Sequence, residues 1–120
     1  MPNPEIEKIL DATCDAHDEI LGYLMTTTAG TAVIASRGMV AELQYVTAMT
    51  GTLNAVAGSL CDLIKSGEHD QVALRMGSNG MIVLPVGIGA LLLVHHHGRN
   101  LSESSANSLN RAILDCARHL

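Results

Sequence analysis

Hydrophobic positions recur with a helical period over the longest uninterrupted segment of the chain, residues 39–65. This segment contains no proline and, between Glu42 and Asp62, no charged residue. At about 100° per residue its large apolar side chains fall on one broad stripe, as in a helix that covers a core. The stripe consists of Met39, Leu43, Val46, Met49, Leu53, Val56, Leu60, Leu63 and Ile64. We therefore expect a long helix whose bulky face lies on a sheet.

Small, uncharged residues occupy the opposite side of this helix. Each interior glycine costs about 1 kcal/mol relative to alanine, so their presence indicates close packing. We predict that this small face meets the same helix of a second copy, related by a two-fold axis. The alternative is an ordinary buried helix of a monomer. The small face consists of Ala48, Gly51, Ala55 and Gly58, flanked by Gln44, Thr47 and Asn54.

The rest of the pattern predicts two further helices and five short strands. Asn3 is a suitable N-cap for a first helix that ends before Gly22, and a last helix begins near Ser102. The first two strands are apolar on both faces, so the sheet should be covered on both sides. Turns are expected at 29–30 and 78–80, a strand end at Pro85 and a helix stop at 65–67. The strands are expected at 22–27, 31–36, 71–76, 81–84 and 90–95.

Length and composition fit one domain over residues 1–120, in the order α-β-β-α-β-β-β-α. The net charge of −5 and the near absence of aromatic residues argue against nucleic acid as a partner. Residues 1–4 lead into a charged segment, so no signal peptide is expected. The apolar run 81–94 is short and contains Pro85, which argues against membrane insertion. We expect a cytoplasmic protein.

Cysteines and histidines suggest one possible metal site. Cys14 with His17, and Cys116 with His119, are each spaced i, i+3 on expected helices. Two Cys and two His could hold zinc. Both cysteines also fall on apolar helix faces, where a thiol needs no metal. We therefore predict no metal, and keep these residues as the alternative ligands.

The run of three histidines at 95–97 is interpreted as a polar strand end entering a loop. On a strand, His95 and His97 point one way and His96 the other, and two ligands on one face do not make a site. No nucleophile elbow, P-loop, dinucleotide-binding fingerprint or HExxH motif is present, so catalysis has no support. Acidic residues on and after the first helix are expected to form a solvated face.

Two stretches resemble the roadblock / dynein light-chain family: residues 20–38 (ILGYLMTTTAGTAVIASRG) and 81–94 (MIVLPVGIGALLLV). The Thr-Ala-Gly turn and the histidine run depart from the family pattern. The resemblance implies a roadblock-type, profilin-like three-layer α/β sandwich. In it, a five-stranded antiparallel sheet has the first and last helices on one face and the long helix on the other. It also implies homo- or heterodimers in which the long helices pair and the third strands join edge to edge.

Together these observations predict a non-enzymatic homodimeric regulatory or scaffold module without a cofactor. The resemblance implies a small Ras-like GTPase, or its signalling complex, as the partner. The alternative is a small-ligand or metal-binding sensor domain that uses the histidines or the Cys/His pairs. The expected dimer interface consists of Gln44, Thr47, Ala48, Gly51, Asn54, Ala55, Gly58, Val72 and Leu74.

Overall fold

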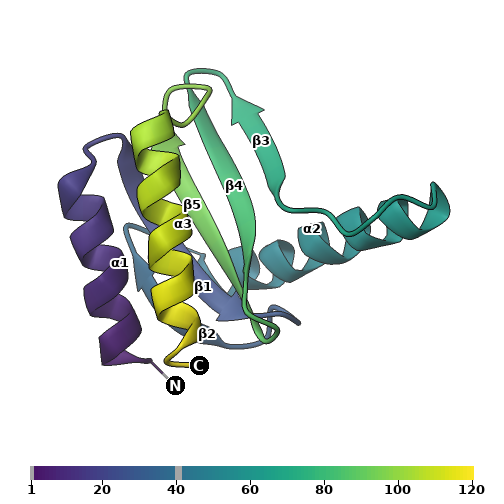
Figure 1. The fold of residues 1–120 in the computed structure, drawn as a ribbon, viewed down its shortest axis with the longest axis horizontal. Coiled ribbons are helices and arrows are strands. Elements are labelled where there is room, and N and C mark those ends of the chain that lie inside the picture. The colour runs from purple at the N-terminus through teal and green to yellow at the C-terminus, as the bar shows by residue number, and fades with distance from the viewer. Residues whose placement is uncertain (1, 40–41) are drawn as a thin grey trace.

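Five antiparallel strands form one sheet in the order β2-β1-β5-β4-β3 (Figure 1). The structure is a computed structural model, and it describes residues 2–39 and 42–120. Sequential strands pair as hairpins at both ends of the sheet, and β5 joins the two halves by pairing with β1 and β4. The strands are β1 Ile20–Thr27, β2 Val33–Arg37, β3 Val72–Met76, β4 Asn79–Val86 and β5 Ala90–His97.

Helices cover both faces of this sheet, as the sequence predicts. The helices α1 (Pro4–Ala16) and α3 (Glu103–Ala117) lie side by side on one face, and α2 (Leu43–Leu63) crosses the other (Figure 1). One core cluster lies under α1 and α3 and a smaller one lies under α2. The predicted element order and the three-layer sandwich are confirmed.

Side chains at the helix starts explain where α1 and α3 begin. The Asn3 carboxamide oxygen accepts hydrogen bonds from the backbone N–H groups of Glu5 and Ile6. The Ser102 hydroxyl accepts one from the Ser105 N–H. Both are N-caps that satisfy amides left free in the first turn.

Several predicted boundaries are wrong by a few residues. The β3–β4 turn is Gly77–Ser78, with Met76 paired to Asn79. Strand β4 continues through Pro85 to Val86. Its pairing with β3 ends at Val83, so no β3 residue lies opposite Pro85 to accept a backbone hydrogen bond that proline could not donate. Helix α2 ends at Leu63 rather than at 65–67, and its first residue is Leu43, so the predicted helical start at Met39 is also wrong. Positions 40 and 41 of the predicted helix lie outside the described residues.

Candidate protein-interaction surface

The orientation predicted for the long helix is wrong over most of its length. Leu43, Val46 and Leu53 pack on the sheet as expected. Met39, which precedes the helix, is also buried in the core cluster under α2, whereas the remaining five large residues of the stripe face away from the sheet. Their exposed fractions are Met49 62%, Val56 53%, Leu60 56%, Leu63 78% and Ile64 72%.

The middle of the small face is what lies against the body of the protein. Thr47, Thr50 and Gly51 are the buried residues of α2. A Cβ added to Gly51 would lie 2.8 Å from the Ala29 carbonyl oxygen, so this glycine permits close contact with the β1–β2 turn. Packing of helix backbone on turn backbone therefore determines which side of α2 faces inward.

An outward apolar stripe results from this orientation. Tyr45, 57% exposed, continues the row of Met49, Val56, Leu60 and Leu63 at spacings of three, four or seven residues. We call this row the α2 stripe. Figure 1 shows that the C-terminal half of α2 projects beyond the sheet. Contiguous exposed apolar surface of this kind marks interaction sites in soluble proteins.

A hollow lies beneath the projecting part of α2. It has a volume of about 630 Å3 and is lined by Gly58, Cys61 and His69 on one side and by Ile88 of the β4–β5 turn on the other. The Ile88 side chain is fully exposed. His69 Nε2 lies 2.8 Å from Asn54 Oδ1, which ties the loop after α2 back to the helix. The hollow and the stripe therefore lie on the same projecting segment.

The outer edge of β3 is the second candidate surface. Among the described strands, β3 pairs only with β4. Leu74 and Met76 are 38% and 41% exposed, and no lysine or proline lies within the strand. Natural edges usually carry such residues or other charges to prevent pairing. The charged residue of β3, Arg75, is hydrogen-bonded to Asn100. This edge is therefore open to a further strand.

The residues predicted for a dimer interface fall into two groups. Thr47 and Gly51 are buried within the chain, and Asn54, Gly58 and Val72 are half-buried. Gln44, Ala48, Ala55 and Leu74 are exposed. The structure holds a single copy of the chain, so the interface itself stays a prediction. Sequence reasoning missed the α2 stripe, because it assigned that stripe to the core.

The alternative zinc ligands do not come together. Helices α1 and α3 run antiparallel (Figure 1). His17 Nε2 lies 2.8 Å from Ser108 Oγ near one end of the pair, whereas the His119 carbonyl oxygen accepts from Asn3 Nδ2 at the other. Over residues 2–39 and 42–120, no group of three or more His, Cys, Asp or Glu side chains has the arrangement of a metal site.

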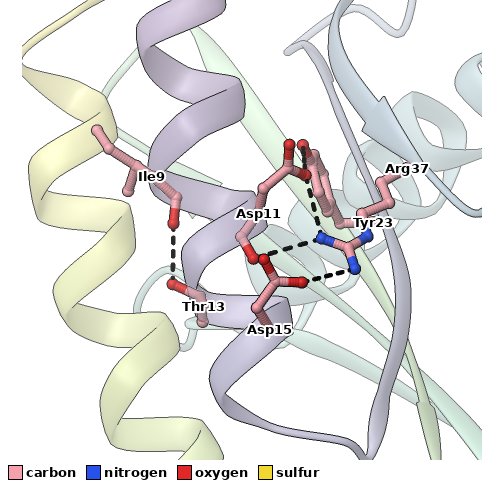
Figure 2. A network of polar contacts seen from close by, with 6 residues as sticks. All are labelled: Ile9, Asp11, Thr13, Asp15, Tyr23 and Arg37. Atoms are coloured by element: carbon pink, nitrogen blue, oxygen red, sulfur yellow. Dashed lines mark hydrogen bonds and ion pairs between the residues drawn. The ribbon is translucent and has the colours of Figure 1, made fainter.

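Arg37 connects the sheet to α1 through two carboxylates. One guanidinium nitrogen lies 2.8 Å from Asp15 Oδ1 and another lies 3.5 Å from Asp11 Oδ1 (Figure 2). The buried Tyr23 donates its hydroxyl to the same Asp11 carboxylate at 3.0 Å. Burial, followed by the hydrogen bond to Asp11, raises the pKa of Tyr23 well above its usual range. Asp11 and Asp15 belong to the acidic residues expected on the first helix; both keep solvent-exposed side-chain surface, at 47% and 68%, while they pair with Arg37.

The histidine run is the end of a strand that enters a loop, as interpreted, but the strand extends past the predicted end at 95 and one of the histidines is buried. All three histidines belong to β5. The His96 side chain is 2% exposed and lies on the side of the sheet covered by α3. It lies over Gly80 of β4, where a Cβ would come within 2.5 Å of His96 Cε1. The pairing of Gly80 with His96 in the β4–β5 hairpin, which leaves room for the imidazole ring, is the feature that could have indicated this burial.

Comparison of the chain with known proteins establishes its class of fold. No family model matches the chain, and no curated protein matches it. Solved structures match over almost the whole length. MglB from Myxococcus xanthus is similar with a TM-score of 0.86 and 16% identity, covering 97% of this chain and 94% of that one. The class is a three-layer α/β sandwich, in which a five-stranded antiparallel sheet has one helix on one face and two helices on the other.

Two further structures specify the fold within this class. A Roadblock/LC7 domain from Streptomyces avermitilis is similar with a TM-score of 0.83, 15% identity and coverage of 94% and 95%. The gliding protein MglB from Thermus thermophilus has a TM-score of 0.80, 17% identity and coverage of 94% and 86%. The chain has the roadblock fold, as the resemblance implied.

No helix in the described parts of the chain combines the length and apolar character needed to cross a bilayer.

Proposed function

We propose that this protein is a non-enzymatic, self-associating roadblock scaffold that binds other proteins. The observation that carries the proposal is the α2 stripe, a row of large apolar side chains on a helix that projects from the body of the protein. Burying such a row against a second copy would gain about 25 cal/mol for each Å2 of apolar surface removed from water. A two-fold axis would let each stripe cover the other.

The β3 edge supports the same assembly. A second β3 strand, antiparallel to the first, would satisfy the unpaired backbone groups and cover Leu74 and Met76. The proposed interface contains the exposed residues of the sequence-based prediction (Gln44, Ala48, Ala55 and Leu74) together with the α2 stripe. The proposed interface leaves out Thr47 and Gly51, because both are buried within the chain and cannot contact a second copy.

The family resemblance supplies the kind of partner: a small Ras-like GTPase or its signalling complex. A scaffold of this kind would act by binding one nucleotide-dependent conformation of the partner more tightly than the other. The fold shared with MglB, a gliding protein in Thermus thermophilus, agrees with a regulatory role. The polar contacts described above each join two elements of the fold.

The mass of the protein in solution tests the proposal. We expect sedimentation analysis to show a dimer or larger assembly for the natural protein. Met49→Glu with Leu60→Glu should shift it to monomers with the helix content kept, because two charges would be buried without partners. Leu114→Glu is the matched control, since Leu114 is 67% exposed on α3, away from the stripe. A monomeric natural protein, or an unchanged mass for the double variant, would contradict self-association through α2.

Partner choice has a separate test. Immobilised natural protein and the double variant are incubated with a lysate of the source cells containing either GDP or a non-hydrolysable GTP analogue. A GTPase retained in one nucleotide state, and lost with the double variant, is the expected result. Retention of GTPases equally in both states would contradict the proposed selection of one conformation.

A further inference from the structure

A second cavity lies on the opposite face of the sheet from α2. It has a volume of about 270 Å3 and opens between β3, β4 and the first half of α3. Its floor is apolar, with Ile82, Leu84 and Leu109. Ligand pockets for drug-sized molecules usually measure roughly 300 to 1,000 Å3. This cavity therefore suits a smaller ligand or a single side chain.

The walls of the cavity are basic, although the protein as a whole is acidic. Arg75 of β3 and Arg99 of the β5–α3 loop both line it, and no Asp or Glu of the described residues does. The ion pairs of the described residues involve Lys8, Arg37 and Arg118, so Arg75 and Arg99 have no carboxylate partner there. Two guanidinium groups near one cavity without a balancing acid favour an anionic ligand.

One of these arginines is held in place. Arg75 Nε and Nη2 donate to Asn100 Oδ1 at 3.1 and 2.8 Å. The contact joins β3 to the loop before α3 across the cavity and fixes the plane of the guanidinium. The second terminal nitrogen, Nη1, has no hydrogen-bond partner among the described residues. A preorganised guanidinium loses less conformational freedom when it binds a carboxylate.

His96 adds an unsatisfied polar group beside the arginines. The residue is buried, with 2% of its surface exposed. Nδ1 lies 3.3 Å from the His97 carbonyl oxygen, and Nε2 has no partner within the described chain. Among the described residues, Ser105 Oγ is the one side-chain polar atom that is fully buried and has no hydrogen-bond partner. Because His96 Nε2 also lacks a partner but is not such an atom, it must retain some contact with solvent. The cavity that His96 lines provides this access.

We propose that this cavity, which we call the Arg75–Arg99 cavity, binds a carboxylate attached to a short apolar chain. The carboxylate would accept hydrogen bonds from Arg75 and Arg99, and from His96 in the tautomer that carries its proton on Nε2. The apolar chain would lie on Ile82, Leu84 and Leu109. The carboxylate can come from a free small acid or from a glutamate side chain of a bound peptide. The proposal does not depend on pairing of the α2 stripes, which lie on the other face of the sheet, although Leu74 of the proposed β3 edge contact also lines the cavity.

Titration of the isotope-labelled protein with defined probes tests the proposal by NMR. The probes are hexanoate, its neutral twin hexanamide, and a capped peptide with one glutamate together with its glutamine twin. We expect saturable shifts of the Gly80, Leu101 and Leu109 amides with at least one carboxylate at millimolar concentration, and none with its neutral twin. Binding of hexanoate alone identifies a free acid as the ligand, and binding of the peptide alone identifies a presented side chain.

Variants distinguish the cavity from nonspecific attraction. Arg75→Gln and Arg99→Gln should each weaken binding by about tenfold or more, because each removes a charge-assisted hydrogen bond. Arg118→Gln is the matched control, since Arg118 is exposed at the end of α3 and pairs with Asp115. Three results would each overturn the proposal. They are equal binding of hexanamide and hexanoate, weakening by Arg118→Gln equal to that of the cavity variants, and the absence of a saturable shift with either carboxylate.

Discussion

Gly51 of α2 lies directly against Gly30 of the β1–β2 turn. A Cβ on Gly51 would lie 2.9 Å from the Gly30 Cα, and a Cβ on Gly30 would lie 2.7 Å from the Thr47 carbonyl oxygen. Gly30 also has a φ of +71°, which disfavours other residues. The contact between these two glycines sets both the distance of α2 from the sheet and the side of α2 that faces solvent.

This contact predicts different outcomes for the two glycines within α2. Gly51→Ala should lower the free energy of unfolding by about 1–3 kcal/mol, because the new methyl group meets backbone atoms that cannot move aside cheaply. At Gly58 the nearest atom to an added Cβ is His69 Cε1 at 3.9 Å. Gly58→Ala should therefore be neutral or stabilising by up to about 1 kcal/mol. Urea unfolding of the two variants measures both effects, and equal destabilisation would contradict the assigned packing.

Glu19 fastens the start of α3 to the start of β1. Its carboxylate accepts hydrogen bonds from the Ser102 N–H at 2.9 Å and from the Ser102 hydroxyl at 2.6 Å. These bonds hold the pKa of Glu19 below its ordinary value of 4.5. A lowered folded-state pKa means that this stabilisation is fully present above about pH 4.5. It is lost as the pH falls through the folded-state value.

Glu19→Gln should therefore lower the free energy of unfolding at neutral pH by about 1 kcal/mol, because the hydrogen bonds lose their charged acceptor. The loss of stability between neutral pH and about pH 3 should also become shallower. Glu68→Gln, in the exposed loop before β3, serves as the control. Chemical unfolding over this pH range gives both numbers. An unchanged acid slope in Glu19→Gln would mean that Ser102 does not stabilise the carboxylate in solution.

The three thiols should differ in reactivity. Cys14 is 8% exposed and Cys116 is fully buried, whereas Cys61 is half-buried on α2. Burial raises the pKa of Cys14, and it raises the pKa of Cys116 to about 11. Since the thiolate is the reactive form, Ellman's reagent at pH 8 should modify Cys61 quickly and the other two only after unfolding. Cys61→Ser should remove the fast phase, and three equal rates would contradict the assigned burial.

The sequence predicted the number, type and order of the elements, because each has its own hydrophobic period and its own caps or turns. It misjudged α2, since large apolar residues normally mark the buried face of a helix. That rule assumes a helix within one chain. Leu60 and Leu63 lie on a segment that projects beyond the sheet, where apolar residues have no core to join.

The cavity near His96 was beyond sequence reasoning for a different reason. Arg75, Gly80 and His96 lie in one row across β3, β4 and β5, and Arg99 follows His96 by three residues. The hydrophobic pattern gives neither this register nor the position of α3, and the cavity depends on both. The left-handed conformation at Lys65 was missed in a similar way. The sequence offered Gly67 as the helix stop, but Lys65, with a φ of +56°, reverses the chain two residues earlier.

The central claim, that α2 stripes of two copies meet, is tested most directly by a distance between them. A spin label at Val56→Cys, in a chain with Cys61→Ser, leaves only two buried cysteines besides the label. Double electron–electron resonance should then give one well-defined distance shorter than the 39 Å length of a single protomer. The distance should disappear on dilution with unlabelled protein and with Leu60→Glu. A labelled protein without dipolar coupling, or with coupling that persists in Leu60→Glu, would contradict pairing through α2.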